Sequence, residues 1–215
     1  MSAEVLSAGS AERDWWLRTL LVLQSPRAVF AALHDDSDEA AHARQEPLAA
    51  VVFLAGVAGV LATSITGRLM DDAEYDRLLV AVWAIFAGGI HGIAAYFVVG
   101  AIVLLGASLA GGLGSYRRAR HVLGFAAVPL ALSLLVWPVR LAVHGTDAFR
   151  TAGSDSGSGG EVFDALEVGF LAWSVALLAI GIRTVHGWTW PRALAATVLP
   201  AAVPALAVAR AYGIV

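Results

Sequence analysis

The chain has 215 residues, of which 59% are hydrophobic and 14% are charged, and its formal net charge is −3. Its mean hydropathy is +0.74, and a soluble domain carries about 25% charged residues, so the composition indicates an integral membrane protein. The absence of cysteine excludes disulfides, thiolate catalysis and cysteine-based metal or iron–sulfur sites.

The first 46 residues are expected to form a cytoplasmic, acidic tail with short amphipathic helices. The apolar stretch from Trp15 to Leu23 is interrupted by Arg18 and has no small-residue cleavage site, so it is not a signal peptide. Its tryptophans and leucines predict a helix that lies in the membrane interface. Packing of the same helix on the domain's own cytoplasmic ends is the alternative, and both interpretations remain open.

A second short helix is predicted next in the chain, immediately before the first span. Ser25 is a suitable N-cap and Pro26 is favoured at the first helical position. The helix presents Val29, Phe30 and Leu33 on one face, and this face is expected to be apolar and buried.

Residues 47–215 are predicted to form one membrane domain. A helix needs about 20 apolar residues to cross about 30 Å of hydrocarbon, and five runs satisfy this requirement. They cover residues 47–67, 78–112, 121–143, 163–182 and 191–212. The first run opens at Pro47, a residue typical of a helix start. The fold class is therefore all-α, a polytopic bundle of five transmembrane helices with a short amphipathic N-terminal segment.

The second run is longer than a bilayer requires. Residues 78–112 contain no charge, and as one helix they would rise about 52 Å. Two short segments broken near Gly88 and Gly89 are the alternative. One long helix is favoured because no polar turn interrupts the run. Gly88 and Gly92 form a small-x-x-x-small pattern, which lets two helices approach closely.

The distribution of arginine predicts the orientation of the chain. Nine of the fourteen arginines fall on one side of the predicted spans, in the N-terminal segment and in the second and fourth loops, and those two loops contain no acid. The first and third loops are acidic, and residues 153–160 in the third are expected to be a flexible linker. Because cytoplasmic loops are enriched in arginine and lysine, the N-terminus is predicted in the cytoplasm and the C-terminus outside the cell membrane.

Three ionisable residues are expected at membrane depth. His91 lies inside the second span, where an ionisable group is a functional candidate or a neutral side chain bonded to another helix. Arg140 lies near the outer end of the third span. It could extend to the headgroups or pair with Glu167 of the fourth span.

The basic cytoplasmic loops hold the candidate binding residues. A basic cluster next to a span attracts anionic headgroups, so we expect it to bind lipid or an acidic partner. The residues concerned are Arg117, Arg118, Arg120, Arg183 and Arg192.

Three regions, the second of them in two parts, resemble in this order the Yip-domain family, small five-span membrane proteins named for their interaction with Ypt/Rab GTPases. They are residues 25–33 (SPRAVFAAL), 111–118 (GGLGSYRR), 124–129 (GFAAVP) and 181–194 (GIRTVHGWTWPRAL). The resemblance is to prokaryotic-type members, because the eukaryotic acidic N-terminal domain is missing. It implies five spans, a cytoplasmic N-terminus and, by analogy with eukaryotic members, a role in vesicle trafficking or membrane shaping.

The favoured functional hypothesis is a non-enzymatic membrane-organising protein or scaffold. No Walker, nucleophile-elbow or zinc-protease motif occurs, so no catalytic residue, cofactor or metal site is expected. The expected partners are the bilayer, including anionic lipids, and a second copy or another membrane protein, but no nucleic acid. The alternative is a small permease or channel component with a path near His91.

Overall fold

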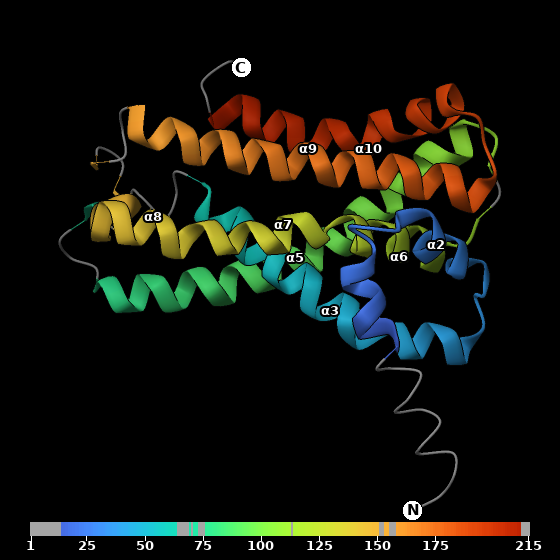
Figure 1. The fold of residues 1–215 in the computed structure, drawn as a ribbon, viewed down its shortest axis with the longest axis horizontal. Helices are drawn as coiled ribbons and strands as arrows, with labels where there is room; N and C mark the ends of the chain where they lie inside the picture. The colour runs from blue at the N-terminus through green and yellow to red at the C-terminus, as the bar shows by residue number, and fades with distance from the viewer. Residues whose placement is uncertain are drawn as a thin grey trace, which may run out of the picture.

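The computed structural model describes residues 14–63, 69, 71–72, 76–112, 114–150, 153–154 and 158–211. Over these residues the chain forms helices joined by turns and loops, with no strand, and the all-α prediction is confirmed for this part. The long helices run side by side along the longest axis of the molecule (Figure 1).

Four helical runs among the described residues are long and apolar enough to cross a membrane. They are Asp38–Leu61, Leu78–Leu109, Tyr116–Phe149 and Gly159–His186, and they follow the order of the first four predicted spans. The last helix, α10 (Trp190–Ala211), is not one of these four, so the fifth span remains a prediction. Residues 64–67 and 212, at the predicted ends of the first and fifth spans, lie outside the described residues.

The first span belongs to a helix that begins earlier than predicted. Helix α3 covers Asp38–Leu61, and the Ser37 hydroxyl caps its first turn by accepting a hydrogen bond from the Ala40 N–H at 3.3 Å. Pro47 is therefore not at a helix start; it lies fully buried inside α3. The predicted boundary between residues 46 and 47 falls within a continuous helix, because the polar cap at Ser37 sets the start.

The second span is one helix, as favoured from the sequence. Helix α5 runs without interruption over Arg77–Leu109, which corresponds to about 50 Å. Gly88 and Gly89 do not break it because they pack against α3. The Asp76 carboxylate caps the start of α5, accepting from the Leu79 N–H at 3.1 Å.

Glycines allow α3 and α5 to pack backbone against backbone. A Cβ atom built on Gly56 would lie 2.5 Å from the Gly92 Cα and would also collide with the Gly88 carbonyl oxygen. One built on Gly92 would collide with the Val52 carbonyl oxygen. The close approach predicted from Gly88-x-x-x-Gly92 is confirmed, and only glycine fits at these positions.

The third span is a series of short segments rather than one regular helix. They are α6 (Tyr116–Ala126), α7 (Val128–Leu132), η2 (Ser133–Leu135), α8 (Val136–His144) and η3 (Gly145–Phe149). The first break is a turn at Ala127, close to Pro129, which has no N–H to donate to the carbonyl four residues earlier.

The fourth span lies within α9, which covers Ser158–His186. The predicted flexible linker is wrong over its last three residues, because residues 158–160 form the first turn of this helix. Residues 155–157 lie outside the described part. At the other end of α9, Gly187 takes a φ of +63° and turns the chain toward α10.

The N-terminal segment, residues 14–34, packs on one end of the bundle (Figure 1). Residues 14–21 are helical, followed by α2 (Pro26–Ala31) and η1 (Ala32–His34). Pro26 occupies the first turn as predicted, although the Ser25 side chain makes no capping bond. Val29, Phe30 and Leu33 are buried, which confirms the predicted apolar face.

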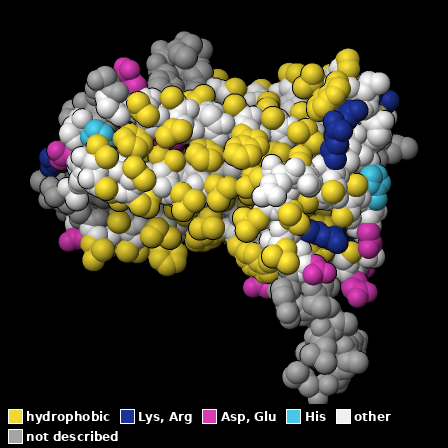
Figure 2. Space-filling view, in the orientation of Figure 1, with side chains coloured by type: hydrophobic (Ala, Val, Ile, Leu, Met, Phe, Trp, Pro, Cys, Tyr) yellow, Lys and Arg dark blue, Asp and Glu magenta, His cyan; other side chains and the backbone are white. Residues whose placement is uncertain are grey.

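Polar and apolar side chains are separated along the long axis. Figure 2 shows hydrophobic side chains over the middle of the molecule and charged side chains toward its two ends. The core lies mainly near the end that carries the N-terminal segment, where Phe30, Phe125 and Ile182 are almost fully buried. Phe30 contacts α9 at Gly181, where a Cβ atom would lie 2.9 Å from its ring.

Candidate functional site at the basic end of the bundle

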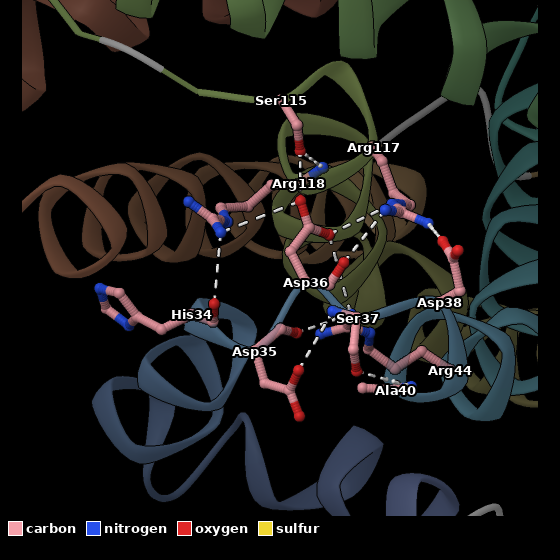
Figure 3. A network of polar contacts seen from close by, with 10 residues as sticks. All are labelled: His34, Asp35, Asp36, Ser37, Asp38, Ala40, Arg44, Ser115, Arg117 and Arg118. Carbon is pink, nitrogen blue, oxygen red and sulfur yellow. Dashed lines mark hydrogen bonds and ion pairs between the residues drawn. The ribbon is translucent and has the colours of Figure 1, made fainter.

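The predicted basic cluster begins at the first turn of α6. The Ser115 hydroxyl accepts a hydrogen bond from the Arg118 N–H at 3.1 Å and so caps this helix. The cap fixes the positions of Arg117 and Arg118 opposite the acidic segment before α3. Both helices therefore start at the same end of the bundle, and their polar caps meet (Figure 3).

Asp36 is the centre of this network. Its carboxylate accepts a hydrogen bond from the Ser115 hydroxyl at 2.6 Å. Three guanidinium groups surround it, with Arg117 Nε at 3.3 Å, Arg118 Nη2 at 3.9 Å and Arg44 Nη2 at 4.0 Å (Figure 3). The carboxylate thus takes the place that an anionic ligand of these arginines would occupy.

Arg117 and Arg118 make further bonds to the same acidic segment. Arg117 pairs with the exposed Asp38 carboxylate and donates to the Asp36 carbonyl at 3.0 Å. Arg118 donates to the His34 carbonyl at 3.3 Å. Two of the predicted binding residues therefore hold this acidic segment against α6, although the side chain of Arg117 is still 38% exposed.

Arg44 is a site residue that the sequence analysis missed. Its side chain is fully buried, donates to the Asp35 carbonyl at 2.9 Å and lies over the Trp15 ring at 5.1 Å. Its Nε and Nη1 have no hydrogen-bond partner among the described residues. A buried guanidinium needs a nearby carboxylate, and Asp36 supplies it.

The signal that could have revealed this network is the acidic run just before the first span. Asp35, Asp36 and Asp38 are close together in the sequence, and the last two pair with arginines of a loop about 80 positions later. Hydrogen bonds from Ser37 lower the pKa of the exposed Asp35 carboxyl, so this residue carries its charge at neutral pH.

Arg120 is held by aromatic rings instead of acids. Its guanidinium lies 4.7 Å from the centre of the Phe97 ring, 4.8 Å from that of Tyr116 and 5.4 Å from that of Tyr96. These are cation–π distances, so the side chain ties α6 to α5.

The two arginines near the last loop also bind their own chain. Arg183 lies 4.7 Å from the centre of the Trp190 ring. Arg192 donates to the Ala110 carbonyl at 2.7 Å and to the Gly111 carbonyl at 3.0 Å, which caps the C-terminal end of α5. The five predicted arginines lie at one end of the bundle, but each has a partner within the protein.

The three ionisable residues that were predicted at membrane depth lie in two different settings. Arg140 Nη1 is 3.4 Å from the Glu167 carboxylate and 3.7 Å from that of Asp164, and its side chain is 12% exposed. Of the two alternatives for Arg140, the structure has the ion pair with Glu167. His91 lies apart from them, exposed on the outer surface of α5.

The described residues offer little room for a bound molecule. The best-defined pocket has space for about 20 Å³, roughly one water molecule, between α5, α6 and α9, and His91 does not line it. No group of three His, Asp or Glu side chains in the described part could hold a metal ion. A permeation path near His91 is therefore not favoured.

The fold and this site define the class of the protein. It is a multi-pass helical membrane protein in which ion pairs hold the acidic segment at the start of α3 against the start of α6. A family model described as the Yip1 domain matches residues 20–211, and the chain belongs to this family. Comparison with curated proteins found no match, and neither did comparison with solved structures.

Proposed function

We propose that this chain is a non-enzymatic membrane-organising protein whose N-terminal segment lies in the headgroup region of the cytoplasmic leaflet. The observation that carries the proposal is the two-sided helix at residues 14–21. Trp15 and Thr19 face the protein and are buried. The outer face is exposed and apolar, and consists of Trp16, Leu17, Leu20 and Leu21.

An exposed apolar face of this kind is unfavourable in water and favourable at the boundary between headgroups and acyl chains. The opposite face is tied to the spans, because the Trp15 ring packs 5.6 Å from that of Phe125. The two interpretations of this helix are therefore compatible. The segment would widen the protein in one leaflet only, which is how an integral protein can organise or bend a membrane.

The basic end supports a preference for anionic lipid in the same leaflet. Each available arginine near the surface is worth about 1 kcal/mol toward anionic headgroups, or roughly a fivefold preference. Arg117 and Arg118 share Asp36, so the preference is expected to be smaller than for five unpaired arginines. Arg120, Arg183 and Arg192 contact aromatic rings rather than carboxylates.

We further propose five spans, with α10 as the fifth and the tail before residue 47 in the cytoplasm. Helix α10 has 22 residues, enough to cross the hydrocarbon layer. An odd number of crossings agrees with Figure 1, in which the N-terminal segment packs at one end and α10 leads toward the other. The excess of arginine at the first end supports its cytoplasmic placement.

The interfacial position can be measured with a fluorophore on Leu20→Cys, since the chain has no other cysteine. In reconstituted vesicles we expect nitroxide lipids labelled near the headgroup to quench it more than lipids labelled deep in the acyl chain. Leu54→Cys, exposed in the middle of α3, is the matched control and should show the opposite order. Efficient quenching of the Leu20 position by aqueous iodide would refute the proposal.

The same label reports the lipid preference. The headgroup nitroxide should quench more strongly when an anionic lipid carries it than when a neutral lipid does. The triple change Arg117→Ala, Arg118→Ala and Arg120→Ala should reduce this difference, whereas Asp38→Asn should increase it by releasing Arg117. Equal quenching by the anionic and the neutral lipid in the unsubstituted protein, the triple variant and Asp38→Asn would refute the proposed preference for anionic lipid.

Orientation is tested with a membrane-impermeant maleimide on intact cells. Thr146→Cys, exposed in η3, should react in intact cells, and Gln24→Cys only after the membrane is permeabilised. The reverse pattern would place the N-terminal segment outside.

A further inference from the structure

Helix α5 exposes a regular seam on its outer surface. Only 28% of its most apolar window is buried, against 33–44% in the other three candidate spans. Exposed residues on this helix recur with alternating steps of four and three. They are Ala87, His91, Ala94, Val98, Ala101 and Leu105. This is the heptad spacing of a helix that packs against another along its whole length.

His91 is the polar member of this seam. It lies two residues from the middle of α5, so about 3 Å from its centre along the axis. The imidazole makes no hydrogen bond with any described residue, and lipid chains offer none. Ionisable side chains at this depth normally face a protein interior, because an unsatisfied polar group in hydrocarbon is costly.

Two other sides of α5 are occupied within the bundle, whereas the large side chains of Phe86, Ile90 and Phe97 are exposed beside the seam. Gly88 and Gly92 lie against α3. Gly106 lies against α10, where a Cβ atom would meet the Ala196 carbonyl oxygen. Nothing in the described part of the chain covers His91, so this face is open to a partner.

We propose that a second copy of this chain covers this face, with α5 packed against α5 around a two-fold axis and the two His91 side chains bonded to each other. A neutral imidazole carries one donor and one acceptor, so it is complementary to itself. A two-fold axis along the seam brings the same residue of both copies together. The alanines on either side of His91 permit the close approach that this bond requires.

The packing geometry can be tested by cysteine cross-linking of the full chain in its own membrane. Ala94→Cys lies on the seam, and Ile93→Cys is also exposed but points away from it, which makes the two a matched pair. Oxidation should give a disulfide-linked dimer with Ala94→Cys and little with Ile93→Cys. Equal yields from both, no dimer from either, or capture of a different protein by Ala94→Cys would overturn the proposal.

The role of His91 is tested by diluting the protein in lipid vesicles. Energy transfer between labelled copies of the protein measures the fraction that is dimeric. Hydrogen bonds between transmembrane helices suggest that His91→Ala weakens dimerisation roughly 3- to 18-fold. His91→Asn, which keeps a donor and an acceptor, should recover most of it. Unchanged dimerisation in His91→Ala would overturn the hydrogen-bonded pair. The result does not depend on the lipid proposal above.

Discussion

Asp36→Asn is expected to lower the free energy of unfolding by about 3 kcal/mol. The change keeps the shape of the side chain but removes the negative charge closest to the fully buried Arg44. Breaking a buried ion pair on one side typically costs 3–5 kcal/mol, because the remaining charge stays desolvated. The measurement is denaturant unfolding of the purified protein in detergent, followed by helical circular dichroism.

The neighbouring acid is the control. Asp38 also pairs with an arginine, but its side chain is 96% exposed, so Asp38→Asn should cost much less stability than Asp36→Asn. Asp36→Asn should also loosen the N-terminal segment, which would appear as faster proteolysis before residue 38. If the two variants lose the same stability, Asp36 is not the centre of the network.

A second substitution at Arg44 tests whether the unpaired charge causes the loss of stability in Asp36→Asn. Replacing Arg44 by Met in the Asp36→Asn protein removes the unpaired charge and keeps most of the buried volume, so stability should partly return. Failure of the double variant to recover would indicate that Asp36 acts mainly through Ser115 and Arg117.

Gly92→Ala is the second change with a large expected effect, a loss of about 2 kcal/mol. Alanine favours a helix over glycine by about 1 kcal/mol, but here the new methyl group would meet the backbone of α3. A backbone carbonyl cannot rotate away as a side chain can, so the two helices must separate. The same unfolding measurement detects this loss.

Gly59→Ala is the matched control on the facing helix. Nothing lies within 4 Å of a Cβ atom built at Gly59, so alanine should stabilise the protein there by up to about 1 kcal/mol. Opposite signs for the two substitutions would confirm that helix contact decides the effect. Equal signs would contradict the close packing of α3 and α5.

Much of the fold could be predicted because the signals are local. An uninterrupted apolar run predicted α5 as one helix, and Gly88-x-x-x-Gly92 predicted its close contact with a neighbour. The apolar face with Phe30 was predicted from helical spacing. The helix start predicted at Pro47 was wrong, because Ser37 was not recognised as the cap of a helix that continues through Pro47.

The candidate site was predicted only in part. The arginines were identified by their density, and the structure gathers them at one end of the bundle. Their partners were not identified, because an ion pair such as Asp36–Arg117 depends on how two distant helix starts are placed in space. The Arg140–Glu167 pair was one of two alternatives, and only the positions of α8 and α9 distinguish them.

By itself, then, the sequence determined the membrane class, the order of the apolar helices and the family. Hydropathy and family motifs are properties of consecutive residues, so they can be recognised without knowing which residues are in contact. Only the arrangement of the helices in space shows that Asp36 pairs with Arg117 and Arg118, that Arg44 is buried, and that His91 faces outward. Each of these three features depends on which helices become neighbours in the folded protein. Charges and backbones interact only at short range, so their contacts form only after the helices have packed.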